Sequence, residues 1–239
     1  MSYFITGTDT GVGKTLIGCA LLHGFAAQGK RVVGMKPIAA GCDERDQKED
    51  VRQLRAASNV LASGGQINPY CFMQTVAPHL AAQFSGIRIN IARIVKSFSE
   101  LNAQADVVIV EGAGGFVVPL NDEQDGADLV AQLGLPIILV VGMRLGCLNH
   151  ALLTAEAIAA RGLTLAGWVA NVLDADMAML NENVAALQQR IGAPLLGVVP
   201  HREQQDAREV ATFLNLALLE QAGDGANELL RESHVKPHG

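Results

Sequence analysis

The sequence lacks the features that mark secreted, membrane-bound and zinc-stabilised proteins. Its four cysteines show no Cys-x-x-Cys spacing, so neither a zinc site nor a disulfide framework is indicated, and a reducing cytoplasm fits best. No charged segment followed by a long apolar run opens the chain, and no apolar run reaches the length of a membrane span. We therefore expect a cytoplasmic protein without a membrane segment.

A strong excess of charge of one sign is also absent. The net charge of −6 comes from 18 basic and 24 acidic residues that are interspersed, which is not typical of a surface that binds nucleic acid or anionic membranes. No proline- or serine-rich linker divides the 239 residues, of which 49% are hydrophobic. Length and composition predict one large α/β domain over residues 1–222. A polar tail over residues 223–239 is expected to be poorly ordered.

The most informative stretch is the segment from Phe4 to Thr15, which reads FITGTDTGVGKT and precedes the apolar run LIGCALL. A short β-type run breaks into a glycine-rich turn and then into helix-forming residues, which is the context of a phosphate-binding loop. Backbone N–H groups and the helix start can face phosphate oxygens, while Lys14 neutralises charge and the Thr15 hydroxyl reaches Mg²⁺. Thr8 stands where the common pattern has its first glycine, so this loop is of an unusual subtype. The alternative is an accidental glycine-rich turn, which the flanking strand and helix argue against.

Short β-rich apolar runs alternate with helical patterns along the rest of the chain. They predict a mostly parallel sheet of about seven strands with helices on both faces, in the manner of P-loop nucleotide-binding proteins. The carboxyl ends of parallel strands meet at one edge of such a sheet, where ligands bind. We expect that edge to collect Lys14, Lys36, Glu111, Asn171 and Pro200.

Acidic residues occur at two informative places. Glu111 directly follows four β-branched residues of a buried strand and precedes a glycine-rich segment that lets a ligand approach, so it is a Walker-B-like metal candidate. A solvated acid at a strand end is the alternative. The segment 41–50 is rich in charge, and most of its charges are expected to be solvated in a loop. Asp50 is the exception that we keep open.

Other regions are less regular or more ambiguous. Residues 59–89 are interpreted as an irregular loop with a short helix near residues 80–84, and a last helix is expected over residues 207–221. Cys147 and His150 stand at the start of a long helix, but this spacing is not enough for a thiol nucleophile and its base. Cys147 is better explained as a small apolar residue. The free N–H groups at this helix start can bind a carboxylate.

Five blocks of the sequence form a recognisable series. They are residues 7–15 (GTDTGVGKT), 36–37 (KP), 110–115 (VEGAGG), 145–150 (LGCLNH) and 167–171 (GWVAN). Taken in order, they resemble the dethiobiotin synthetases, the ATP-dependent enzymes of the penultimate step of biotin synthesis. The resemblance runs from residue 3 to about residue 220, and it is specific because the loop and the later blocks occur together.

The resemblance implies a cyclo-ligase that closes a ring on 7,8-diaminononanoate with CO₂. One substrate amine takes up CO₂ to form a carbamate, and the carbamate oxygen attacks the γ-phosphate of MgATP. The second amine then attacks the carbamic-phosphoric anhydride to give the ureido ring, ADP and phosphate. A homodimer is also implied, with the diamine at the interface and its carboxylate held by a helix start of the neighbouring subunit.

The resemblance also assigns roles to residues at matching positions. The expected catalytic residues are Lys36, Lys14 and Thr10, and the expected Mg²⁺ ligands are Thr15, Asp50 and Glu111. Nucleotide contacts are expected from Gly11, Val12, Gly13, Lys14, Thr15, Leu16, Glu111, Asn171, Val172, Pro200, His201 and Arg202. Substrate contacts are expected from Lys36, Ala40, Gly115, Phe116, Leu148 and Asn149.

Two positions depart from the family's pattern. Members often read Lys-Pro-x-x-Ser-Gly where this chain has Ala40, so a hydroxyl beside the substrate is missing. Asn183 stands approximately where some relatives place a tyrosine near the substrate carboxylate. Three alternatives stay open: a partition or switch ATPase acting through a protein partner, a cobyrinic-acid amide synthetase type, and a non-enzymatic nucleotide-binding module. The first normally carries a lysine near the position of Asp9, and the second normally continues into a glutaminase domain.

Overall fold

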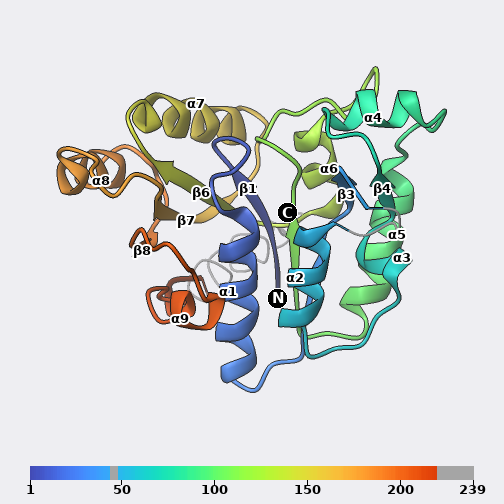
Figure 1. Cartoon of the computed structure of the whole chain (residues 1–239), viewed down its shortest axis with the longest axis horizontal. Coiled ribbons are helices and arrows are strands. Elements are labelled where there is room, and N and C mark those ends of the chain that lie inside the picture. The colour runs from blue at the N-terminus through green and yellow to red at the C-terminus, as the bar shows by residue number, and fades with distance from the viewer. Residues whose placement is uncertain (44–47, 220–239) are drawn as a thin grey trace, which may run out of the picture.

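A computed structural model describes residues 1–43 and 48–219, and parallel strands form its centre (Figure 1). The strands are β1 (Ser2–Gly7), β2 (Val32–Met35), β3 (Ile38–Ala40), β4 (Tyr70–Phe72), β5 (Val107–Glu111), β6 (Ile137–Met143), β7 (Leu165–Val172) and β8 (Leu195–Val199). Six of them make one parallel sheet in the order β2-β5-β1-β6-β7-β8. The chain therefore leaves β1 towards one half of the sheet and later returns to fill the other half. Such a change of direction creates a crevice at the carboxyl ends of the central strands.

Helices cover both faces of this sheet (Figure 1). One face packs against α1 (Lys14–Ala27), α2 (Glu49–Ala57) and α9 (Ala207–Ala211), and the other against α5 (Ile91–Asn102), α6 (Gly126–Leu133), α7 (Cys147–Ala160) and α8 (Leu180–Gln188). Two short helices, α3 (Gly64–Ile67) and α4 (Pro78–Phe84), lie in the β2–β5 connection. Ile5 packs with α1 while its neighbour Phe4 packs with α5 and α6, because successive strand residues point to opposite faces. The expected α/β architecture is confirmed.

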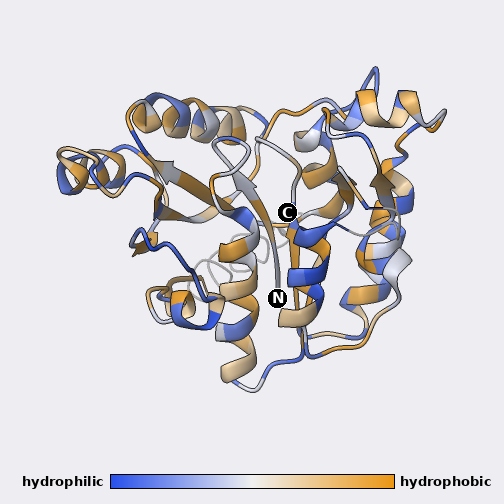
Figure 2. Ribbon diagram, viewed as in Figure 1, coloured by the Kyte–Doolittle hydropathy of each residue, from blue (hydrophilic) through white to orange (hydrophobic). Residues whose placement is uncertain are grey.

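The core explains why these segments fold as they do. All five residues of β5 and all seven of β6 are buried, as expected for β-branched runs covered on both faces. Figure 2 shows hydrophobic colour along the strands and much hydrophilic colour on α2. The helices also carry local signals: Asp125 caps α6 by accepting from Ala127 N and Asp128 N, and Gly134 ends it at φ 64°.

The expected single sheet of about seven strands is corrected by the structure. The main sheet has six strands, and β3 and β4 form a separate two-stranded parallel sheet. These two strands have three residues each, which is too short for an alternating pattern to be recognised in the sequence. The region 59–89 is accordingly more ordered than the expected loop, since α3 and β4 lie within it together with the expected short helix α4.

The cysteine expectation was wrong for one pair. Cys42 and Cys71 form a disulfide with Cα atoms 6.0 Å apart, although 29 residues separate them in the chain. The cause is the small sheet, whose register places Ala39 opposite Cys71 and so brings the end of β3 beside β4. Cys19 and Cys147 are free and buried. Burial raises the pKa of the Cys19 thiol to about 12, and the buried Cys147 agrees with the small apolar role expected of it.

The carboxyl-terminal part also differs from the expectation. The helix expected over residues 207–221 is interrupted after Ala211, because the chain turns back onto β8: the carbonyl oxygen of Phe213 lies against Gly197, and Asn215 N donates to Leu196 O at 2.8 Å. Residues 217–219 are helical again, and residues 220 and 221 lie outside the described residues. The expected polar tail, residues 223–239, lies outside the described residues. Within residues 1–43 and 48–219, none of the helices combines the length and the hydropathy that crossing a membrane requires.

Candidate active site

The loop between β1 and α1 is shaped by glycines. Gly11 and Gly13 have φ angles of 77° and 95°, in the left-handed region that favours glycine. At Gly13 a Cβ would in addition collide with the side-chain amide of Asn171, which donates to Val12 O at 2.9 Å from beneath the loop. No side chain caps the start of the 14-residue α1, so the N–H groups of its first turn are left for an anionic ligand.

Lys14 lies at the floor of this loop with 6% of its surface exposed, and its ammonium donates to Asp9 O at 2.8 Å. Burial, followed by repulsion from the Lys36 charge, lowers the pKa of Lys14 to about 8. The carboxylate of Asp9 is used elsewhere, because it accepts from Thr10 N at 2.6 Å and pairs with Arg144 at 2.8 Å. The lysine is therefore held by a neutral carbonyl oxygen, a contact that a phosphate oxygen can replace.

Glu111 is the acidic centre of the site, at the end of β5 and opposite Ile5 of β1, and it is only 1% exposed. Its Oε1 accepts from Lys36 Nζ at 2.5 Å and from Thr15 Oγ1 at 3.0 Å. Its Oε2 is buried and has no hydrogen-bond partner among the residues that the structure describes. A buried carboxylate oxygen without a donor is costly, and a cation beside it would remove that cost.

Asp50 lies in the first turn of α2 and completes this group. Its Oδ2 is 3.6 Å from Lys36 Nζ, so one ammonium stands between the two carboxylates. The structure thus brings together Thr15, Asp50 and Glu111, which are far apart in the sequence. These three oxygen donors are of the kind that a hard cation such as Mg²⁺ prefers.

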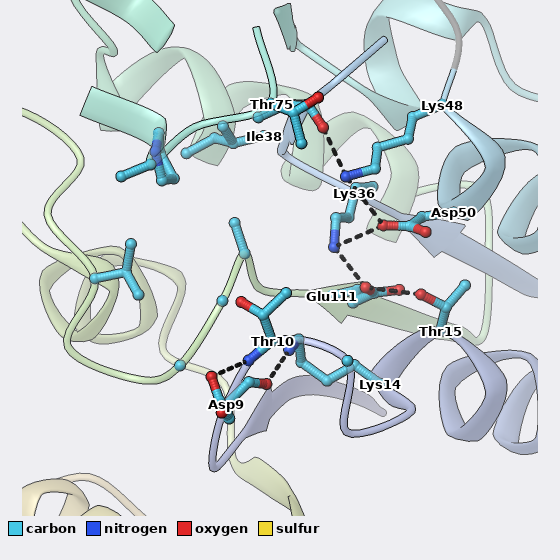
Figure 3. Close-up of a pocket in the computed structure, with 18 of the residues that line it drawn as sticks. Asp9, Thr10, Lys14, Thr15, Lys36, Ile38, Lys48, Asp50, Thr75 and Glu111 are labelled. Atoms are coloured by element: carbon cyan, nitrogen blue, oxygen red, sulfur yellow. Dashed lines mark hydrogen bonds and ion pairs between the residues drawn. The ribbon is translucent and has the colours of Figure 1, made fainter. Parts of the chain in front are cut away.

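A cavity of about 780 Å³ opens above these residues. Figure 3 shows Lys14 and Thr10 on the side of the phosphate-binding loop, Glu111 and Lys36 in the middle, and Lys48 and Thr75 on the far side. On the far side, beside Lys48 and Thr75, the lining includes the apolar residues Ile38, Ala40, Val76, Ala77 and Pro78. The cavity therefore combines charged groups with an apolar wall on its far side, as a substrate with an alkyl chain and a reacting polar head requires.

Sequence reasoning missed two parts of this lining. Lys48 belongs to the charged segment that was expected to be solvated, and residues 75–78 belong to the supposed loop. The one signal for Lys48 in the sequence was its position two residues before Asp50. A helix whose first turn presents Asp50 to the cavity also places its N-cap residue, Lys48, near the cavity.

Comparison with known proteins shows the family to which this chain belongs. A family model described as an AAA domain matches residues 1–209. The chain is 57% identical over 215 residues to the "ATP-dependent dethiobiotin synthetase BioD" of Nitrosospira multiformis, a match that covers 90% of this chain and 95% of the relative. The chain belongs to the dethiobiotin synthetase family. Proteins of the same name from Aromatoleum aromaticum and Ralstonia nicotianae are 56% and 51% identical over 218 and 220 residues, with 90% of this chain covered in both matches and 97% and 96% of the relatives.

Solved structures agree on the fold. The MinC:MinD cell division protein complex of Aquifex aeolicus matches with a TM-score of 0.53 at 14% identity, covering 100% of this chain and 99% of that chain. MinD of Pyrococcus horikoshii, complexed with Mg-ADP, matches with a TM-score of 0.51 at 14% identity, covering 94% and 96%. Identities this low show the fold alone. The expected resemblance to dethiobiotin synthetases is confirmed by the named relatives, and it takes precedence over the partition-ATPase alternative.

The residues expected from the dethiobiotin synthetase pattern fall into two groups. Those that line the cavity are Thr10, Gly11, Gly13, Lys14, Thr15, Lys36, Ala40, Asp50, Glu111 and Gly115. Those outside its lining are Val12, Leu16, Phe116, Leu148, Asn149, Asn171, Val172, Pro200, His201 and Arg202. Phe116 is 5% exposed and packs in the core under the cavity. Arg202 is exposed, forms an ion pair with Glu209 and lies over the ring of Phe213.

Proposed function

We propose that this protein catalyses the MgATP-dependent ring closure of 7,8-diaminononanoate with CO₂ to dethiobiotin. The observation that carries the proposal is the position of Lys36 and Glu111 between the phosphate-binding loop and the apolar wall on the far side of the cavity. Phosphoryl transfer requires positioned charge at this junction, and ring closure requires space for the alkyl chain beside it. Membership of the dethiobiotin synthetase family supports the same reaction.

The proposed reaction has three bond-forming steps. An amine lone pair of the diamine attacks CO₂, and the nitrogen loses a proton to water to leave an anionic carbamate. A carbamate oxygen attacks the γ-phosphorus, and ADP leaves with the electrons of the broken P–O bond. The second amine attacks the anhydride carbonyl carbon, phosphate leaves with the electrons of the C–O bond, and the amine proton passes to water. The ureido ring results.

The chain's own groups supply binding and charge in these steps. N–H groups of the loop and of the first turn of α1 bind phosphate oxygens, and Lys14 exchanges Asp9 O for a phosphate oxygen. Lys36 lies at the middle of the cavity and stabilises the charge that develops on the γ-phosphate and on the attacking carbamate.

Mg²⁺ fits the site because the buried Oε2 of Glu111 has no donor among the described residues. Thr15, Asp50 and Glu111 would hold the ion. When bound, Mg²⁺ would supply positive charge that offsets the negative charge of the phosphate groups during phosphoryl transfer.

The proposal includes a two-fold symmetric homodimer. The start of α7 has no side-chain cap, and Leu145 just before it is 97% exposed. Uncapped N–H groups of a 14-residue helix are a suitable acceptor site for the carboxylate of the diamine. Leu148 and Asn149 lie in that first turn and do not line the cavity of their own subunit, which supports a role towards a second copy of the chain.

The test is formation of dethiobiotin from all substrates. Purified protein, MgATP, the diamine and carbon-13 bicarbonate should give dethiobiotin that carries one heavy carbon, detected by mass spectrometry. Phosphate release should require the diamine and bicarbonate together. A rate of ATP hydrolysis that is the same with and without the diamine would contradict the synthetase function and favour a switch ATPase. Lys14→Met is the matched inactive control, since it keeps the shape of the cavity but removes the phosphate-binding ammonium.

A further inference from the structure

Lys48 places a third ammonium group in the active-site cavity. It is the N-cap residue of α2, and its side chain is 32% exposed. Its Nζ donates to Ala40 O at 2.6 Å and lies 3.9 Å from Asp50 Oδ2. The ammonium is therefore directed inward, to the edge where the small sheet borders the cavity, and is not free in solvent as a lysine of a charged loop would be.

The charges across the cavity follow an order. Lys14 lies at the loop, Lys36 lies between Glu111 and Asp50, and Lys48 lies on the far side of Asp50 (Figure 3). Asp50 is thus shared by two ammonium groups. If its carboxylate and that of Glu111 turn to a cation, Lys36 and Lys48 lose their anionic partners. Both then become available to anions of the substrates.

The position of Lys48 decides which anion it meets. The γ-phosphate receives the nucleophile on the side away from ADP, because attacking and leaving oxygens lie roughly in line. Lys14 marks the side of ADP, so the nucleophile enters from the side of Lys36 and Lys48. Next to Lys48 stand Ala40 and Thr75, where the apolar lining begins. A carbamate attached to an alkyl chain fits this boundary, with its carboxylate towards the ammonium and its chain towards the apolar wall.

We propose that Lys48 is a substrate-positioning residue whose ammonium binds the carbamate oxygens, in the place of the hydroxyl that is missing at Ala40. The proposal rests on the synthetase function proposed above. A hydrogen bond from an ammonium to a carboxylate is stronger than one from a hydroxyl, so the exchange compensates for the lost serine. Lys48 discriminates in favour of the carboxylated amine, because it repels the protonated amine and attracts the carbamate.

The test separates carbamate binding from other roles. In Lys48→Met the KM for bicarbonate should rise by roughly tenfold to hundredfold, the usual effect of removing a charged hydrogen bond. The Kd of MgATP and Tm should stay at the wild-type values, and the Kd of the diamine measured without bicarbonate should not rise, because the charge that repels its ammonium group is gone. Lys48→Arg, which keeps the charge, should recover part of the effect, and so should Ala40→Ser in the Lys48→Met background. Lys96→Met, at an exposed lysine of α5, is the matched control.

Other outcomes would overturn the proposal. A weaker affinity for MgATP in Lys48→Met would assign the ammonium to the γ-phosphate, and an unchanged KM for bicarbonate would leave Lys48 without a role in catalysis. If Lys48→Met does not fold, Lys48→Gln, which can still donate to Ala40 O, decides in its place. If the KM for bicarbonate is unchanged in Lys48→Met while the wild type and Lys96→Met form dethiobiotin normally, only the Lys48 proposal has failed. No dethiobiotin from the wild type would instead refute the proposed function.

Discussion

The buried lysines of the cavity are paired with the protein's own oxygens, and a nucleotide has to replace those contacts. Lys14 is held by Asp9 O, whereas Lys36 is held by the carboxylate of Glu111. The first contact is with a neutral group and the second with a charged one. The pKa of Lys14 is lowered to about 8 in the absence of a ligand. Bound phosphate would replace the neutral partner of Lys14 with a negatively charged one.

We predict that nucleotide binding takes up a proton at alkaline pH. At about pH 8.5 Lys14 is mostly neutral in the free protein, and bound phosphate raises its pKa, so the complex holds the proton that the free protein lacks. Titration calorimetry with MgADP in buffers of different ionisation enthalpy should show this uptake near pH 8.5 and not near pH 6.5, where Lys14 is charged in both states. Lys14→Arg, always charged, should show none. A binding enthalpy near pH 8.5 that does not depend on the buffer would contradict the prediction.

Lys36 should affect the rate far more than nucleotide affinity. In Lys36→Met we expect kcat for dethiobiotin formation to fall by roughly 100- to 1000-fold, because the charge acts on the transition state, while the Kd of MgATP changes little. Steady-state kinetics and calorimetry measure the two quantities. An unchanged kcat would remove Lys36 from the mechanism.

Lys36→Met also leaves Glu111, which is 1% exposed, without its countercharge, so its Tm should fall. The double variant Lys36→Met/Glu111→Gln is the control. It should regain Tm, which would show that the loss of stability in Lys36→Met comes from the unpaired carboxylate of Glu111.

The sequence predicted the residues at strand ends better than those between elements. Lys36 directly follows β2 and Glu111 is the last residue of β5, and the parallel arrangement alone brings such positions to one edge. Lys48 and Thr75 reach the cavity only through the placement of α2 and of the small sheet. That placement depends on packing at long sequence separation, which no local pattern contains. The Cys42–Cys71 disulfide escaped prediction for the same reason.

The connection from β1 to α1 depends on glycine for both backbone conformation and space. We predict that Gly13→Ala weakens MgATP binding by roughly tenfold or more, because it adds left-handed strain of about 1–2 kcal/mol and a collision with Asn171. Gly29→Ala is a matched control: its φ is 79°, but nothing lies within 4 Å of the added Cβ. The control should lower Tm by roughly 2–8 °C and keep nucleotide affinity. If Gly29→Ala weakened MgATP binding as much as Gly13→Ala, the weaker binding would not come from the contact with Asn171.

Regular elements were predicted where local signals and tertiary packing agree. The buried β-branched run of β5 was expected from the sequence, and α7 starts at Cys147, where the start of a long helix was expected. The helix expected over residues 207–221 is interrupted between Ala211 and residue 217, because the hydrogen bond from Asn215 N to Leu196 O holds this part of the chain against β8. Helical propensity is a weak signal, and a contact with the sheet overrode it.

In the molecule as a whole, the strand order places the phosphate-binding loop at the point where the chain changes direction. β1 lies between β5 and β6, so its end has Glu111 on one side and the approach to α7 on the other. The ion pair between Asp9 and Arg144 joins the loop to the segment that leads into α7. One edge of the sheet thus carries both the nucleotide end of the site and the helix start proposed to serve a second subunit.

The proposed dimer can be tested at the segment before α7. Leu145 is 97% exposed, which is unusual for a large apolar side chain beside an uncapped helix start and suits a contact with a second copy. In Leu145→Asp we expect the dimer dissociation constant to rise by roughly 30-fold or more, since a charge would be buried in the interface. MgATP affinity should be retained because the loop and α1 are complete within one chain, while the KM for the diamine should rise. Leu61→Asp, at a leucine that is 94% exposed between α2 and α3, is the matched control and should keep both dimer and activity. Light scattering and kinetics on both variants decide the matter: if Leu145→Asp remains a dimer with an unchanged KM, this face is not where the subunits meet, and the start of α7 has no substrate carboxylate to bind.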